Sequence, residues 1–281
     1  PISIVIIWRS SRVINFAQAG LALFSTYVGY ECVKVIGNYW IALPIAVIAG
    51  ALIASMIEFL FMRFLAKLHI NSPISAVAPI IVTLGLLGVI RASIAFIWGG
   101  QELRIAAPLS NIGYSIGDKT LVFSPMKLMI LISVAIVLVI LGIIFQRTNL
   151  GLALKASSFA PEISKLSGLK VDLIRNIGWA LSGGVAALAG LLQTANGSGS
   201  ISPEALEFAI LLVSGFIAAV IGGLESLIGA VFGGLLLGTL VSFALMYIDG
   251  GLFFIAPLFI LIMVLIFRPR GLFAPKAGRH A

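Results

Sequence analysis

Charged residues are scarce in this chain of 281 residues. Asp, Glu, Lys and Arg make up 10% of the sequence, whereas soluble domains average about a quarter. The single cysteine, Cys32, excludes an internal disulfide and a cysteine-based metal cluster. The two histidines, His69 and His280, lie in a loop and in the tail without metal-ligand spacing. The phosphate-binding motif G-x-x-x-x-G-K-S/T is also absent, so we predict no metal site and no ATP site in this chain.

Hydrophobic residues, in contrast, make up 60% of the sequence, and the mean hydropathy is +1.18. The apolar runs are continuous and about 20 residues long, the length that crosses a bilayer as a helix. We therefore predict an all-α, polytopic transmembrane helical bundle of about eight spans, forming one domain over residues 1–281. After the stretch that holds Asn15 and Gln18, the expected spans are 41–62, 73–98, 128–146, 173–193, 208–221, 229–247 and 252–267. Residues 1–8 are too short to span, and we expect them to end a truncated first helix whose native start lies upstream.

The basic residues predict the orientation of these spans. Most of the 18 Lys and Arg residues fall at alternate span ends, which indicates a cytoplasmic side that holds the loop 146–173 and the C-terminal tail. The net charge of +8 is then explained by orientation and anionic lipid headgroups, and we expect no nucleic-acid partner. Residues 99–127 form the main segment on the outer side, as a small folded cap or a short hairpin from Tyr114 to Phe123.

The cytoplasmic loop 146–173 carries the signals of a short amphipathic helix. Pro161 suits the first turn of a helix, Ile163 and Leu166 fall on one face, and Gly168 can adopt the left-handed conformation that ends a helix. Such a helix either docks into a groove on a cytoplasmic partner or lies on the lipid surface. The basic residues in and beside the loop are Arg147, Lys155, Lys165, Lys170 and Arg175.

Four polar residues lie at or within apolar segments, where an unpaired polar group is costly. Asn15 and Gln18 either line a translocation path or hydrogen-bond an irregular backbone where the second span begins. Thr83 and Arg91 lie in a span that proline and glycine loosen, and they are further candidates for the path. Arg91 is close to the outer interface, where its side chain can also snorkel to water.

Glycines recur at helical spacing in the later spans. Small residues three or four positions apart let the backbones of two helices approach closely in a membrane. This pattern predicts helix-packing roles, and the residues concerned are Gly183, Gly190, Gly222, Gly223, Gly229 and Gly233.

Four stretches, VINFAQAG, GLALKASSFAPEISKLSGL, SISPE and GGLESLIGAVFGGLLLG, occur in this order along the chain. Together they resemble the branched-chain amino acid type of ABC-transporter permease. The resemblance covers nearly the whole chain. This sequence departs from the family pattern in the serine-rich ASSFAP and in Glu225, where a small residue is more usual.

The resemblance implies an importer subunit of the inner or plasma membrane, without catalysis of its own. A coupling helix would insert into a cytoplasmic ATPase, and its residues here are Ala156, Pro161, Glu162, Ile163, Leu166 and Gly168. The implied partners are a second permease, two ATPase subunits that carry ATP and Mg²⁺, and an extracytoplasmic solute-binding protein. The implied cargo is a branched-chain or related amino acid.

Two other functions remain open from the residues. The first is an ABC permease for urea, short amides or another small polar solute. The second is an ion-coupled secondary transporter that works alone, which usually places paired carboxylates at the membrane midplane. Here the spans hold little beyond Glu58, which lies near the inner end of its span, and we expect it to pair with Arg63 or to reach water.

Overall fold

The computed structural model describes residues 1–67, 74–116, 119–120, 123–204, 206–248, 255–268 and 271–273. The loop with His69 and the tail with His280 lie outside these ranges. Helices account for most of the described residues, which confirms the all-α fold class. The helices are α1 (Ile2–Ser11), α2 (Gln18–Ile36), α3 (Tyr39–Ile57), the π-helix η1 (Glu58–Met62), α4 (Arg63–Lys67), α5 (Ile74–Trp98), α6 (Pro125–Arg147), α7 (Asn149–Phe159), α8 (Pro161–Leu166), α9 (Val171–Asn196), α10 (Leu206–Gly222), α11 (Leu227–Tyr247) and α12 (Ile255–Phe267). The strands are β1 (Leu103–Arg104), β2 (Ser115–Ile116), β3 (Lys119–Thr120) and β4 (Ser200–Ile201).

Five helical stretches are long and apolar enough to cross a membrane, and they match predicted spans to within a few residues. These stretches are Tyr39–Leu65, Val77–Trp98, Pro125–Arg147, Val171–Asn196 and Leu227–Tyr247. Helices α1, α10 and α12 are apolar but shorter. The chain is thus a polytopic helical membrane protein, while the total of about eight spans stays a prediction.

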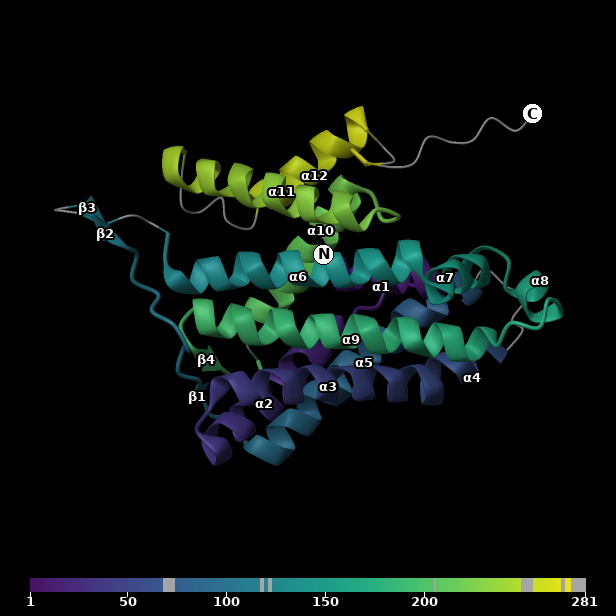
Figure 1. Ribbon diagram of the computed structural model, residues 1–281, viewed down its shortest axis with the longest axis horizontal. Coiled ribbons are helices and arrows are strands. Elements are labelled where there is room, and N and C mark those ends of the chain that lie inside the picture. Colours follow the sequence, from purple (N-terminus) through teal and green to yellow (C-terminus); the bar gives the residue numbers. More distant parts are fainter. Residues whose placement is uncertain are drawn as a thin grey trace.

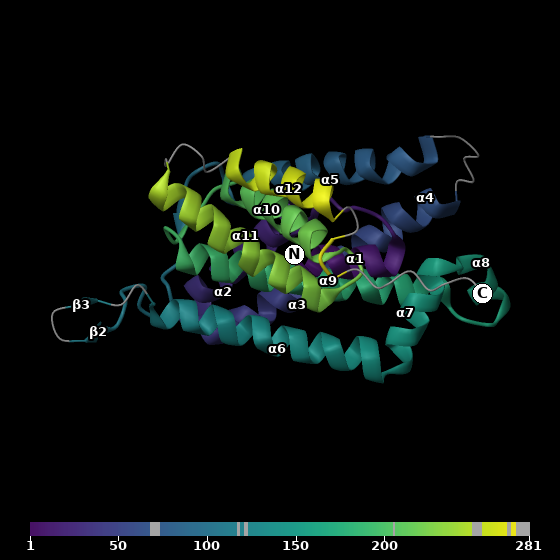
Figure 2. The ribbon, with the colours of Figure 1, turned by 90° about the horizontal axis from the view of Figure 1, so that it is seen from above.

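Helix α9 lies at the centre of the bundle, where it packs against α1, α2 and α3. The long helices run roughly along one axis, with α7 and α8 at one end and the short strands at the other (Figure 1). Figure 2 shows α5 and α6 on opposite sides of the bundle. Because α8 leads directly into α9, a cytoplasmic contact at α8 would act on the most central helix.

Small residues allow α9 to approach its neighbours closely. A Cβ atom at Gly183 would overlap the backbone carbonyl of Gly50 and the side chain of Ala54 on α3. One at Gly190 would lie 2.6 Å from Oγ1 of Thr26 and 2.8 Å from the carbonyl oxygen of Ala22 on α2. These contacts join three helices backbone to backbone.

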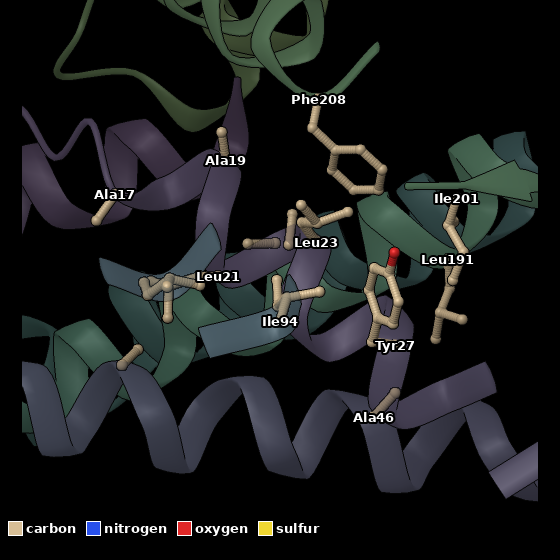
Figure 3. Packing of buried hydrophobic residues seen from close by; sticks show 14 of the residues in the cluster. Ala17, Ala19, Leu21, Leu23, Tyr27, Ala46, Ile94, Leu191, Ile201 and Phe208 are labelled. Atoms are coloured by element: carbon tan, nitrogen blue, oxygen red, sulfur yellow. The ribbon is translucent and has the colours of Figure 1, made fainter. Parts of the chain in front are cut away.

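Larger apolar side chains fill the space beside these contacts, towards the end of the bundle that carries β1 and β4. Leu23 and Tyr27 of α2 lie beside Ile94 of α5 and Leu191 of α9, and Phe208 of α10 closes the cluster (Figure 3). All five side chains are buried. This core fixes α2, α5, α9 and α10 relative to one another.

Residues 12–17 break the path between α1 and α2. Helix α1 ends where Arg12 adopts the left-handed conformation, with a φ of 54°, and donates its backbone N–H to the carbonyl oxygen of Trp8. The left-handed conformation is uncommon for a residue with a side chain. The irregular backbone that follows needs hydrogen-bond partners other than helix carbonyls.

Two short antiparallel pairs of strands join the ends of the helices opposite α8. Strands β2 and β3 pair Ser115 with Thr120, and the N–H of Tyr114 donates to the carbonyl oxygen of Phe123 at 3.4 Å. The hairpin predicted between Tyr114 and Phe123 is therefore present. Strands β1 and β4 pair Leu103 with Ile201, a contact that the sequence did not indicate.

Candidate functional site

The loop that follows α6 contains two helices, where the sequence suggested one. Thr148 caps α7 by accepting a hydrogen bond from the N–H of Gly151, and the sharp turn brings Gly151 against Phe145, with no room for a side chain. Ala160 then separates α7 from α8. The stretch from Ala156 to Gly168 is thus not one helix, because Ala156 belongs to the last turn of α7.

Helix α8 is short and is ended by two backbone hydrogen bonds. It begins at Pro161, and Gly168 follows it with a φ of 83°. The N–H of Gly168 donates to the carbonyl oxygen of Lys165, and the N–H of Leu169 donates to that of Ser164, each at 3.0 Å. This is the pattern of a Schellman cap, which glycine makes without strain.

The apolar side chains of α8 point away from the protein. Ile163 is 66% exposed and Leu166 is 89% exposed, while Ser164 is buried on the opposite face. Glu162 is exposed beside them. Leu169, just after the helix, adds a third apolar side chain at the edge of this surface. The arrangement presents a compact apolar projection with a carboxylate next to it.

Two arginines at the end of α1 hold the base of this loop. The guanidinium of Arg12 lies 4.4 Å from the ring of Phe159, at the end of α7, and forms an ion pair of 2.8 Å with Glu225 in the turn between α10 and α11. Arg9 lies 4.5 Å above the ring of Phe145 at the end of α6. Both contacts are cation–π interactions. Glu225, which is unusual for this motif, therefore ties the α10–α11 turn to α1.

A network of charged side chains links the end of α3 to the start of α9. Glu58 is 1% exposed, and it accepts a hydrogen bond of 2.6 Å from Nε of Arg175 and one of 2.9 Å from Nδ2 of Asn176. Arg63 does not pair with Glu58 as the sequence suggested. It donates from Nη2 to Asp172 at 3.0 Å, and Arg175 also approaches Asp172 at 3.4 Å. The prediction that Glu58 pairs with Arg63 or reaches water was therefore wrong, because its partner is Arg175 and the side chain is buried.

Asn15, Gln18 and Thr83 lie together around the break between α1 and α2. Asn15 donates to Oε1 of Gln18 at 3.1 Å, and Gln18 donates to the backbone and the hydroxyl oxygens of Ser182 on α9. Thr83 of α5 accepts a hydrogen bond of 3.2 Å from the N–H of Phe16. All four polar side chains are buried. Asn15 also accepts a hydrogen bond of 2.9 Å from the N–H of Ala17. Asn15 and Thr83 thus serve the irregular backbone of residues 12–17, a role predicted for Asn15, while Gln18 links this break to α9.

Arg91 lies apart from this cluster. It is on α5, about two helical turns beyond Thr83, at 3.6 residues per turn. Its side chain is partly exposed, while its Nε is buried without a hydrogen-bond partner among the described residues. An apolar pocket of about 520 Å³ lies between α10, α11 and α12, and its lining includes none of Asn15, Gln18, Thr83 and Arg91.

The glycines near the C-terminal helices lie where α10 and α11 meet. A Cβ atom at Gly222 would overlap the carbonyl of Gly229, and one at Gly233 would overlap that of Ala218. Gly223 has a φ of 98° at the start of the turn between the two helices. The backbones of α10 and α11 are therefore in direct contact, as those of α3 and α9 are.

Comparison with known proteins identifies the chain's family. Residues 2–267 match the family described as branched-chain amino acid transport system / permease component. The chain belongs to this family. It is a permease component of a transport system, and it is not an enzyme. A permease component of such a system works with further components.

Several named relatives align with more than half of the permease. The probable branched-chain amino acid transport permease protein LivH of Methanocaldococcus jannaschii is 28% identical over 253 residues, which cover 88% of this chain and 76% of that protein. The high-affinity branched-chain amino acid transport system permease protein BraD of Pseudomonas aeruginosa is 24% identical, over 92% of this chain and 85% of that protein. The fructose import permease protein FrcC of Rhizobium meliloti is 29% identical, over 57% of this chain and 46% of that protein. No solved structure matches.

Sequence reasoning about the permease missed the charged network between α3 and α9. A signal existed in the sequence, because Glu58 stands in an apolar span, and a buried carboxylate needs a cationic partner. Arg175 and Asn176 begin another apolar span and were suitable partners. Choosing Arg175 over the nearer Arg63 requires the packing of α3 on α9, which the sequence does not reveal.

Proposed function

We propose that this permease is the membrane subunit of an ATP-driven importer for branched-chain or related amino acids. Helix α8 is its docking point for a cytoplasmic ATPase. The observation that carries this proposal is the exposure of Ile163 and Leu166 on a capped helix that leads directly into α9. Apolar side chains on one face of a short helix are suited to a groove on a partner.

The proposed coupling follows from the connections of α8. ATP and Mg²⁺ would be held by two partner ATPase subunits, whose closure would push on α8. Only residues 167–170 separate α8 from α9, and the backbone hydrogen bonds of Gly168 and Leu169 to α8 hold this link in place. A displacement of α8 would thus move α9, and with it α1, α2 and α3, between inward-open and outward-open states.

Asn15, Gln18 and Thr83 are proposed to stabilise the α1–α2 break beside the translocation path. Arg91 is proposed to lie further along the same path. A second permease subunit and an extracytoplasmic solute-binding protein complete the proposed assembly. This arrangement places α8 and the C-terminus on the cytoplasmic side of the cell membrane and β1–β4 on the outer side. The names of the relatives LivH and BraD support the substrate class.

The test is a double variant at the exposed apolar side chains, Ile163→Ser with Leu166→Ser. Leu150→Ser with Leu152→Ser is the control, because these residues are also exposed but lie on α7. The tagged permease is purified in mild detergent from its host, and ATPase subunits that co-purify are identified by mass spectrometry. Uptake of labelled leucine is then measured in proteoliposomes that contain the complete transporter, with ATP inside and binding protein outside.

We expect the α8 variant to lose both the ATPase subunits and ATP-dependent uptake, while the control keeps the ATPase subunits. Retention of the ATPase by the α8 variant would refute the docking site. Uptake without ATP, driven by an ion gradient, would make the protein a secondary transporter. Competition by urea, an amide or fructose, but not by leucine, isoleucine or valine, would correct the substrate class alone.

A further inference from the structure

A groove of about 800 Å³ opens between the end of α3 and the start of α9. Its lining comes from the last turns of α3 with η1 and the start of α4, from the last turn of α8 with the link that follows it, and from the first turns of α9. The stretch Tyr39–Leu65 is one of the membrane-spanning candidates, and the groove lies beside its last turns. The groove is therefore level with one surface of the membrane.

The charges at the groove are not balanced. The two carboxylates in its lining are paired, Glu58 with Arg175 and Asp172 with Arg63. Lys165 and Lys170 also line the groove and are exposed, and neither has an ion-pair partner among the described residues.

Arg63 adds an unused donor to the same lining. Its Nη2 is occupied by Asp172, whereas its Nε is buried and has no hydrogen-bond partner within the described ranges. A donor shielded from water and left unpaired is costly. Lys165 acts on Asp172 through space but forms no ion pair with it. The groove thus combines two exposed ammonium groups with a guanidinium that has an unpaired N–H, and these groups together favour a phosphate.

The groove continues into an apolar stripe on the outside of α3. Leu52, Met56 and Phe59 line the groove, and each is more than half exposed. Their spacing of four and three residues puts them on one face of the helix. Leu173 on α9, which is 58% exposed, forms the opposite wall. In a membrane this stripe is covered by acyl chains.

We propose that the groove binds an anionic phospholipid, with the phosphate between Lys165, Lys170 and Arg63 and an acyl chain along Leu52 and Met56. The positive charge at the membrane surface and the apolar stripe that leaves it fit the two parts of one lipid molecule. Basic pockets between membrane helices bind anionic headgroups in this way. The inference rests on the membrane location of the chain and not on the proposed transport activity.

The test compares two double variants that remove the same charge. Lys165→Gln with Lys170→Gln removes the ammonium groups at the groove. Arg147→Gln with Lys155→Gln removes two exposed charges of the same cytoplasmic loop that do not line it. The full-length permease, purified with its partner subunits and in parallel without the ATPase subunits, is incubated with equal amounts of phosphatidylglycerol and phosphatidylcholine of identical acyl chains. The retained lipids are counted by native mass spectrometry, and size-exclusion chromatography verifies that each variant is folded.

We expect the wild-type protein to retain phosphatidylglycerol preferentially. In the groove variant this preference should fall about 30-fold. Each basic residue near an anionic lipid contributes about 1 kcal/mol, the variant removes two, and 1.4 kcal/mol is a factor of ten. The control variant should stay within about threefold of the wild type, because diffuse attraction is weak compared with direct contact.

Three results would overturn the proposal. Equal losses in both double variants would mean diffuse attraction of lipids to a basic surface. Displacement of the lipid by millimolar inorganic phosphate would make free phosphate the ligand. Loss of phosphatidylglycerol from the wild-type protein whenever the ATPase subunits are bound would assign the groove to the ATPase interface, which α8 borders.

Discussion

Replacement of Glu58 by leucine is expected to destabilise the permease strongly. The side chain is almost completely buried, and leucine has a similar volume, so the substitution removes the charge with little change in packing. Arg175, which is 15% exposed, would lose its contact of 2.6 Å and keep only the longer contact of 3.4 Å with Asp172. Asn176 would lose one acceptor but retain the carbonyl oxygen of Ser55.

The size of the effect follows from the charge that is left behind. Removing one partner of a buried ion pair typically costs about 3 to 5 kcal/mol, because the other charge remains buried and uncompensated. Arg175 keeps Asp172 and some contact with water, so we expect a loss near the lower end, about 3 kcal/mol in the free energy of unfolding. Arg175→Leu should cost more, about 4 kcal/mol, because it leaves the less exposed carboxylate with Asn176 but without a cation.

The double variant Glu58→Leu with Arg175→Leu decides whether loss of the ion pair causes the destabilisation of the single variants. Replacing both charges by apolar side chains is often nearly neutral, so the double variant should be within about 1 kcal/mol of the wild type. The assay is reversible unfolding in mixed detergent micelles followed by tryptophan fluorescence, which the buried Trp179 of α9 reports. A loss below about 1 kcal/mol for Glu58→Leu, or a double variant as unstable as the sum of the single ones, would refute this reasoning.

Three further substitutions test the glycines and the polar cluster. Gly183→Ala should cost about 2 kcal/mol in the free energy of unfolding, because its Cβ atom would overlap Gly50. Gly168→Val should uncouple ATP-dependent uptake while the protein still inserts into the membrane, since the left-handed conformation costs about 1 to 2 kcal/mol for a residue with a side chain. Gln18→Leu should lower the free energy of unfolding by about 1 to 3 kcal/mol, because it leaves the buried Nδ2 of Asn15 without its acceptor. Its effect on the KM for the transported solute should be small.

Each of these three predictions has its own control or contrary outcome. Gly142→Ala is matched to Gly183→Ala, because a Cβ atom at Gly142 meets nothing within 4 Å, and equal losses would count against the packing argument. For Gly168→Val the control is Gly85→Ala. A Cβ atom at Gly85 also meets nothing within 4 Å, so this variant should leave uptake unchanged. A large rise in the KM of the Gln18 variant at unchanged stability would show that this side chain contacts the solute and does not merely hold the backbone.

The helices and the hairpin that could be predicted from the sequence are those that neighbouring residues determine. Long apolar runs predicted the spans, because crossing hydrocarbon fixes both length and composition. Pro161 and Gly168 predicted the two ends of α8, because proline fixes φ in the helical range and glycine adopts the left-handed conformation without strain. The hairpin around residues 115–120 follows from neighbouring residues in the same way. In each case the signal and the structure that it specifies lie within a few residues.

The unpredicted features all join residues that are distant in the chain. Arg12 and Glu225 are separated by 213 positions, and Arg175 and Glu58 by 117. The helices are apolar on nearly every side, so their sequences do not mark which face meets another helix and which meets lipid. Helix α7 was missed for a different reason. The start signal at Pro161 marked only α8, and no separate helix was predicted for the residues before Ala160.

The contact between Gly50 and Gly183 restricts which motions the bundle can make. Two helices whose backbones touch have no side chains between them that could change rotamer and let one slide past the other. Helices α3 and α9 are therefore expected to travel as one rigid body through any transport cycle, together with the ion-paired end that holds Glu58. The relative motion must occur elsewhere. Helices α10 and α11 also touch backbone to backbone, so the pocket bordered by α10, α11 and α12 offers free volume for α12 to move against that pair.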